Sequence, residues 1–93
     1  MGRVKRPQPK RIAEKVLQIR LRLNLSQNEM IHRMGLENDL KREEISDFER
    51  GKRIPSLIVT LHYARAYGLT ADVLIDDALD VPTKPVSKRT LSK

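Results

Sequence analysis

Apolar residues near the start of the chain recur at steps of three and four positions, which is the period of an α-helix with one buried side. The pattern begins after Pro9 and stops at Asn24, and its members are Ile12, Val16, Ile19 and Leu23. A second apolar pair, Leu17 and Leu21, lies four positions apart and widens the apolar surface beyond one narrow stripe. The folded part therefore starts with an amphipathic helix.

The signals for both ends of a second helix follow directly. Ser26 is a preferred N-cap residue, and Glu29, three positions later, is placed to bond back to its amide, as in a capping box. Gly35 accepts the left-handed conformation that ends many helices. We expect a helix of about two turns between these residues, with an inner face formed by Met30, Ile31 and Met34.

A third helix is predicted after a polar turn at residues 37–39, because Ile45 and Phe48 lie three positions apart and Gly51 follows. Asp39 is expected to cap an added turn through residues 40–42.

Two further helices complete the pattern. Pro55 favours the first turn of a fourth helix, Gly68 ends it, and its expected inner residues are Leu57, Leu61, Ala64 and Tyr67. Thr70 caps a fifth helix that directs Val73 and Leu74 inward. No stretch alternates with period two, so we expect no sheet. The predicted fold is all-α, a compact bundle of five short helices.

The charge of the chain divides it into three parts. The 93 residues include 19 basic and 12 acidic side chains, for a formal net charge of +7. Residues 1–11 hold five basic residues and residues 81–93 hold four, with no acid in either segment. Both segments contain proline and little apolar material to bury. We expect flexible basic arms at 1–11 and 81–93 and a folded domain at 12–80.

Composition also narrows the function. The chain has no cysteine, so it forms no disulfide framework and no thiolate zinc site, which fits a reducing compartment. No apolar run approaches the roughly 20 residues of a membrane span, and we expect a cytoplasmic protein without a membrane partner. The basic balance favours a polyanionic partner such as nucleic acid, although basic ends also serve as plain solubilising tails.

The sequence contains few residues in an arrangement that would support catalysis. His32 and His62 are far apart in the sequence, and there is no Gly-rich phosphate loop or nucleophile elbow. Glu43, Glu44 and Asp47 point around a helix with only partial convergence, which is typical of a solvated face rather than of a metal site. We expect no catalytic residue, no metal, no cofactor and no small-molecule ligand.

One ordered set of sequence motifs is more informative about function than the composition. It consists of Arg20, the sequence LSQ at 25–27, Gly35, the run ISDFERGKRIPSL at 45–57 and YARAYGLT at 63–70. In this order the motifs resemble the lambda-repressor-like helix-turn-helix family of Cro/CI or XRE type, over about residues 12–78. The run at 45–57 is the most specific part.

The resemblance implies a DNA-binding role for particular residues. Gln27, at the start of helix two, would contact a phosphate, and helix three would enter the major groove. The positions that match base-reading residues are Arg42, Glu43, Ser46 and Asp47. Arg50, Lys52 and Arg53 match a loop that holds phosphates, and Glu49 matches an acid that pairs with the arginine of helix one, here Arg20. The implied function is sequence-specific binding of double-stranded DNA by a transcriptional regulator, expected to be a repressor.

Two features of the sequence differ from the pattern of this family, and they leave a second hypothesis about function open. Ile45 follows Gly35 by ten positions, a longer turn than in common members of the family. The acids of helix three also oppose phosphate: either they discourage non-specific binding, or the helix contacts a protein. The second hypothesis is therefore a helical protein-interaction module, such as an antitoxin or regulator subunit, that uses its acidic helix three on a protein partner.

The same resemblance bears on assembly. Apolar or aromatic positions outside the expected inner faces, Leu17, Leu21, Ile58, Val59 and His62, suggest a partner surface. We expect a homodimer joined through helices four and five, because symmetric dimers of such proteins contact two half-sites. The basic arm at 1–11 is expected to follow the DNA as well.

Overall fold

The structure is a computed structural model, and it describes residues 8–83. This part of the chain contains no strand and five helices: α1 (Ile12–Arg22), α2 (Gln27–Met34), α3 (Arg42–Glu49), α4 (Leu57–Ala66) and α5 (Ala71–Ile75). The predicted all-α, five-helix fold is confirmed. Most of the two predicted basic arms, residues 1–7 and 84–93, lies outside the described residues.

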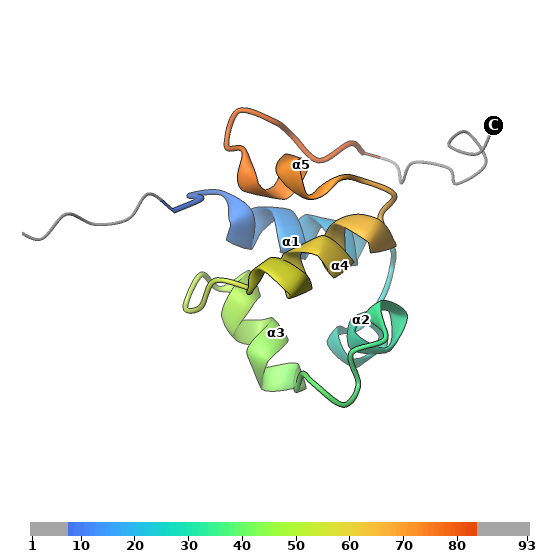
Figure 1. Ribbon diagram of the computed structural model, residues 1–93. Helices are drawn as coiled ribbons and strands as arrows, with labels where there is room; N and C mark the ends of the chain where they lie inside the picture. The colour runs from blue at the N-terminus through green and yellow to red at the C-terminus, as the bar shows by residue number, and fades with distance from the viewer. Residues whose placement is uncertain (1–7, 84–93) are drawn as a thin grey trace, which may run out of the picture.

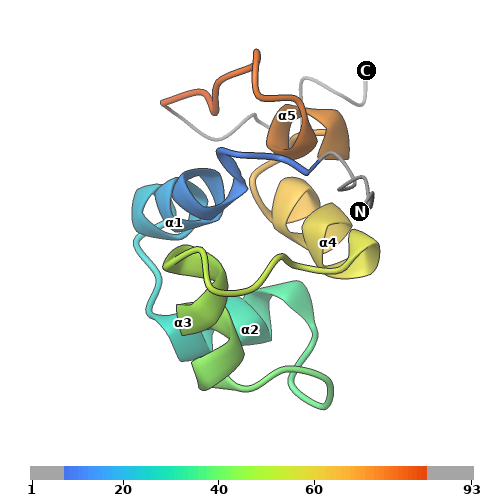
Figure 2. The ribbon, with the colours of Figure 1, turned by 90° about the vertical axis from the view of Figure 1, so that its left-hand side faces the viewer.

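The helices are stacked so that α1 and α4 lie between the α2–α3 pair at one end and α5 at the other (Figure 1). Helix α1 packs on α3 and α5, α4 packs on α2 and α5, and α2 packs on α3. Figure 2 shows the same order from the side, with α2 and α3 together below α1 and α4. The α2–α3 pair is therefore covered from one side only.

A single apolar core holds the stack together. Every helix contributes to it, and the buried side chains at its centre are Val16, Ile19, Met30, Ile45, Phe48, Tyr63, Tyr67 and Leu74. Each fully buried apolar side chain of this size contributes about 1.5–3 kcal/mol relative to an exposed one. Because the core is shared among all five helices, it fixes how they lie relative to one another.

Helix α2 has the ends that its sequence predicts. The Ser26 hydroxyl accepts from the amide of Glu29 at 3.1 Å, and the Glu29 carboxylate accepts from the amide of Ser26 at 2.7 Å. Gly35 ends the helix with φ of 73°, a conformation that a Cβ atom would strain. The predicted capping box and glycine end are confirmed.

The start of α3 differs from the prediction. Asp39 does not cap an added turn, because its amide and that of Leu40 both donate to the Leu36 carbonyl at 2.9 Å, closing a separate turn. Leu36 is buried and anchors that turn to the core. The helix begins only at Arg42, and the Glu44 carboxylate accepts from the amide of Lys41 at 3.0 Å, just before it.

The inner face of α4 also differs. Ser56 caps the helix by accepting from the amide of Val59 at 3.2 Å. The buried residues are Thr60, Tyr63, Ala64 and Tyr67, whereas Leu57 is 80% exposed and Leu61 is half-buried. Leu57 lies on the same helical stripe as Thr60, but at the first position of α4 its side chain extends beyond the core against which Val59 and Thr60 pack. The expectation that Leu57 lines the core was wrong for this reason.

The two ends of the described chain meet beside α1. The amides of Lys10 and Arg11 donate to the Asp77 carboxylate at 3.0 Å, which supplies the cap that α1 lacks locally. The Arg11 guanidinium donates to the Asp77 carbonyl at 2.7 Å and to the Asp80 carboxylate at 2.6 Å. Arg11 is therefore bound to the helical unit, one residue before the predicted boundary.

The second predicted boundary shifts in the same way. Val81 is buried in the core, and the carbonyl of Pro82 accepts from the Tyr67 hydroxyl at 2.7 Å and from the Arg22 guanidinium at 2.9 Å. These contacts extend the folded unit past residue 80, because an apolar side chain and a hydrogen-bonded carbonyl attach the segment to α1 and α4.

Lys15 is a buried cation that the sequence pattern did not single out. Its ammonium group donates to the carbonyls of Val73 at 2.8 Å and Asp76 at 2.7 Å, which lie in and just after α5. Burial lowers the pKa of Lys15, and the neighbouring charge of Arg11 lowers it further. By satisfying carbonyls at a helix end, Lys15 attaches α5 to α1.

We predict that Asp77→Ala lowers the melting temperature at neutral pH and that the difference from wild type narrows on acidification. Hydrogen bonds from the amides of Lys10 and Arg11 lower the pKa of Asp77 below its ordinary 3.8. The stability from this shift is fully present above 3.8 and is lost as pH falls through the lower pKa of the folded state.

Thermal melts across the acid range test this expectation. Asp39→Ala is the matched control, because the Asp39 side chain is exposed and has no hydrogen bond within residues 8–83. A difference between Asp77→Ala and wild type that stays constant with pH would contradict the assignment.

Candidate nucleic-acid interface

The outer side of α3 is a polar surface of the α2–α3 pair. Ile45 and Phe48 are buried against the core, so the helical period turns the residues between them outward. Arg42 and Glu43 are exposed, and Ser46 is half-exposed one turn later. Because Ser46 follows Arg42 by four positions and Glu43 by three, these three side chains share one side of α3, near its N-terminal end.

The segment after α3 folds back along the helix. Gly51 adopts φ of 75°, and the amides of Lys52 and Arg53 then donate to the Asp47 carbonyl at 2.9 and 3.3 Å. Arg50, Lys52 and Arg53 are all exposed. A loop rich in backbone turns and cations thus lies beside the outer side of α3.

Two carboxylates of α3 face these arginines. Asp47 lies 3.4 Å from the Arg50 guanidinium and 3.9 Å from that of Arg53. Glu44, one turn earlier, lies 3.5 Å from Arg53. Asp47 therefore points toward the loop as well as outward. Lys52 takes part in no ion pair within the described part of the chain.

A mostly buried ion pair joins α3 to α1. The Arg20 guanidinium binds both oxygens of Glu49, with Nε to Oε2 at 2.5 Å and Nη2 to Oε1 at 2.9 Å. Their side chains are 15% and 6% exposed. The hydrogen bonds with Glu49 raise the pKa of Arg20, so the arginine stays charged. The pair fixes the C-terminal end of α3 on α1.

Helix α2 is tied into the same pair. The Arg20 guanidinium also donates to the Leu25 carbonyl at 3.0 Å, and the Gln27 side-chain amide donates to Glu49 Oε1 at 3.1 Å. Gln27 is half-buried at the first position of α2. Three helices are thereby held in one arrangement by one arginine and one glutamate.

A family model of the helix-turn-helix matches residues 16–74, more than half of the chain. The chain belongs to this helix-turn-helix family, of XRE or lambda-repressor type. Comparisons with curated proteins and with solved structures each found no match. The family comprises DNA-binding transcription regulators and is generally non-enzymatic.

Within this helix-turn-helix unit, the residues proposed from the sequence lie at three places. Arg42, Glu43 and Ser46 are brought together on the outer side of α3, and Arg50, Lys52 and Arg53 lie in the loop that follows. Gln27 lies at the start of α2, but its amide already bonds Glu49.

Sequence reasoning missed two contacts of this surface. The Asp47–Arg50 pair has a local signal, because residues three apart are neighbours on a helix. The Glu44–Arg53 pair has none, since it depends on the loop folding back after Gly51.

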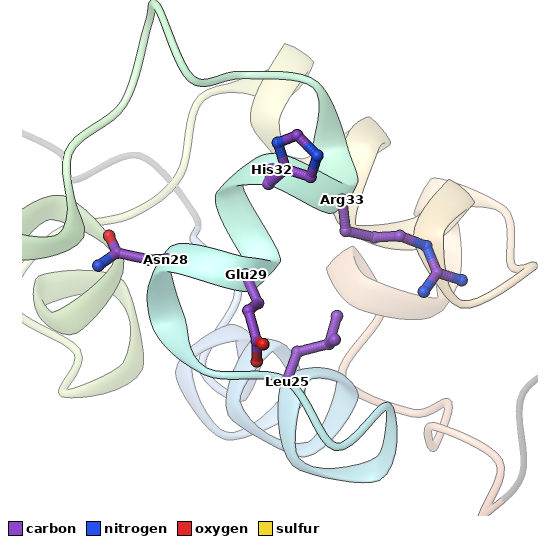
Figure 3. Close-up of a pocket in the computed structure, with 5 residues that line it drawn as sticks. All are labelled: Leu25, Asn28, Glu29, His32 and Arg33. Carbon is purple, nitrogen blue, oxygen red and sulfur yellow. The ribbon is translucent and has the colours of Figure 1, made fainter.

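A hollow of about 390 Å³ lies along another side of α2, lined by Leu25, Asn28, Glu29, His32 and Arg33. Figure 3 shows these side chains pointing in different directions, with Asn28 toward α3 and Arg33 toward α4. His32 pairs with Glu37, and Arg33 donates to the Ala66 carbonyl at 3.3 Å. The groups do not converge on one point, so the hollow lacks an acid–base arrangement.

None of the helices in residues 8–83 is long and apolar enough to cross a bilayer.

We predict that Glu49→Leu lowers the free energy of unfolding by about 3–5 kcal/mol, because Arg20 is then left mostly buried without its partner. The double variant Arg20→Leu/Glu49→Leu should be less destabilised than Glu49→Leu alone, since it leaves no unpaired buried charge. Urea denaturation of the two variants and wild type measures both differences. Equal losses in the two variants would show that the pair acts only through its separate contacts.

Proposed function

We propose that this protein is a transcriptional repressor that binds double-stranded DNA sequence-specifically, with the outer side of α3 in the major groove. The observation that carries the proposal is the exposed polar side of α3 next to the three loop cations Arg50, Lys52 and Arg53. Base-reading and phosphate-binding groups require this adjacency, because phosphates flank the groove that a recognition helix enters. Repression would follow from occupation of the site.

The residues at the start of α3 are proposed to read bases. Arg42 has the fork of donors that pairs with guanine, Glu43 accepts from the cytosine amino group, and Ser46 bonds either kind of edge. N-terminal residues of a recognition helix make such contacts, and α3 begins at Arg42. Asp47 is the fourth candidate, although its carboxylate faces Arg50 and Arg53.

Phosphate contacts are proposed for two flanking sites. The start of a helix carries partial positive charge, and the Gln27 side-chain amide, held by Glu49, lies at the start of α2. The loop cations form the other site. We also propose that basic residues 3, 5 and 6 of the N-terminal arm extend these contacts along the DNA.

Selection from random duplexes, followed by binding measurements, tests the proposal. Arg42→Ala should change the preferred base at one position, by about 1–3 kcal/mol. Lys52→Ala is the matched comparison: it should weaken all duplexes alike and reduce the salt slope by about one. If both variants weaken all duplexes uniformly, α3 does not read bases. If wild type selects no duplex, the protein-interaction module becomes the better hypothesis.

We also propose that the repressor acts as a homodimer joined at the start of α4. Ile54, Leu57 and Ile58 are 41%, 80% and 60% exposed and lie within five consecutive positions of the chain. Exposed aliphatic residues gathered in this way are typical of partner surfaces. Val59, in contrast, packs partly against the core and is not free for a partner.

We expect Ile58→Asp to shift the protein toward monomer and to lower DNA affinity, because two half-sites are no longer bound together. Sedimentation velocity at several concentrations measures the assembly. Leu21→Asp is the matched control, since Leu21 is 57% exposed but belongs to a different helix, α1. Wild type that remains monomeric at every concentration would overturn the dimer.

A further inference from the structure

The two arginines of the α3 loop already have anionic partners in the free protein. Arg53 lies between Glu44 at 3.5 Å and Asp47 at 3.9 Å, and Arg50 lies 3.4 Å from Asp47. The pairing is built by the backbone, because the amides of Lys52 and Arg53 donate to the Asp47 carbonyl and draw the loop over α3. The carboxylates thus occupy the positions where DNA phosphates would bind the same arginines.

These pairs contribute little to holding the fold together. The arginine side chains are 55% and 58% exposed, and the carboxylates of Glu44 and Asp47 are 31% and 28% exposed. Ion pairs in such surroundings add little to stability, because water screens the attraction and ordering long side chains opposes it. The main effect of these ion pairs is therefore on the binding of other anions by the two arginines.

We propose that Glu44 and Asp47 act as built-in counterions, which phosphates must displace from Arg50 and Arg53 before the loop can hold DNA. The proposal rests on the proposed function. It assigns Glu44 a role and gives Asp47 a role other than base reading. The counterions weaken the sequence-independent part of binding, so that a duplex is held firmly only where base contacts on α3 are added.

The displacement also changes how binding depends on salt. A lysine or arginine that binds a phosphate releases a condensed cation from the DNA, which makes affinity fall as salt rises. Here each freed carboxylate takes up a cation from solution as its arginine leaves. The cations taken up by the protein offset the cations released from the DNA. The affinity of wild type therefore falls less steeply with salt than the number of loop cations implies.

The double variant Glu44→Gln/Asp47→Asn tests the proposal directly. Gln at position 44 keeps an acceptor for the amide of Lys41, so the start of α3 is preserved. We expect affinity for a labelled duplex of random sequence to rise about three- to tenfold. The slope of the logarithm of affinity against the logarithm of salt concentration should become more negative by about one to two, measured between roughly 50 and 200 mM salt. A duplex enriched by wild type should gain by the same factor, since base contacts are unchanged.

The matched control is Glu37→Gln/Asp39→Asn. It removes one glutamate and one aspartate, as the test variant does, but from the turn before α3. Glu37 pairs with His32, and neither control carboxylate contacts an arginine within residues 8–83. We expect the control to gain less than twofold. A gain equal to that of the test variant would show that only net charge matters and would overturn the proposal.

A second comparison isolates the pairing itself. In an Arg53→Ala background, Glu44→Gln should have no effect on affinity, because its carboxylate has lost the arginine that it occupies. An undiminished effect of Glu44→Gln there would overturn the counterion role. These single changes also keep the test available if the double variant folds poorly, which thermal melts report.

The outcomes separate this proposal from the proposed function. If neither wild type nor the double variant binds any duplex, DNA binding itself fails. If wild type binds and the double variant gains no affinity, only the counterion role fails. If Asp47→Asn changes the preferred base at one position without a general gain, Asp47 reads a base and the counterion role fails for that residue.

Discussion

The hydrogen-bonded pair of Arg20 and Glu49 is the contact on which the arrangement of α1, α2 and α3 depends. It joins α1 to the last residue of α3, and the same two side chains reach α2 through the Leu25 carbonyl and the Gln27 amide. Such a pair need not add net stability over an apolar contact. It does favour one arrangement, because a shifted α3 would leave a charge mostly buried without a partner.

With that arrangement fixed, the short α3 presents a different kind of residue in each direction. Ile45 and Phe48 face the core, Glu44 and Asp47 face the loop cations, and Arg42 and Glu43 remain exposed. The helical period separates the packed side from the outer side, and the loop returning past Gly51 places the cations beside Glu44 and Asp47. Within two turns of backbone, α3 thus has a packed side, a side paired with the loop cations and an exposed polar side.

The opposite end of the molecule uses charge for attachment instead. Asp77 accepts from the amides before α1, Lys15 donates to carbonyls around α5, and Arg11 bonds Asp80. The acidic and basic side chains in these contacts are bound within the fold, although the composition alone does not distinguish them from free surface charges. The region around α2, α3 and the loop also pairs many of its charges, but it leaves Arg42, Glu43 and Lys52 exposed and without an ion pair within residues 8–83.

Short-range features were predictable because the residues that make them are close in the chain. The capping box of Ser26 and Glu29, the helix end at Gly35 and the apolar period of α1 depend on neighbours within a few positions, and the five-helix fold follows from such signals. The residues of α3 and its loop that we propose to contact DNA likewise came from one short run, residues 42–53.

The amino-acid sequence by itself therefore determined the number, kind and approximate ends of the helices. Only the tertiary structure decided where α3 begins, which part of α4 is covered, why Lys15 is buried and which carboxylate occupies Arg53. Each of these depends on segments that meet only after folding, such as the Leu36 turn on the core or the loop returning past Gly51. The local sequence pattern carries no information about such long-range contacts, because packing decides which partner a side chain has, whereas the pattern reflects only its neighbours in the chain.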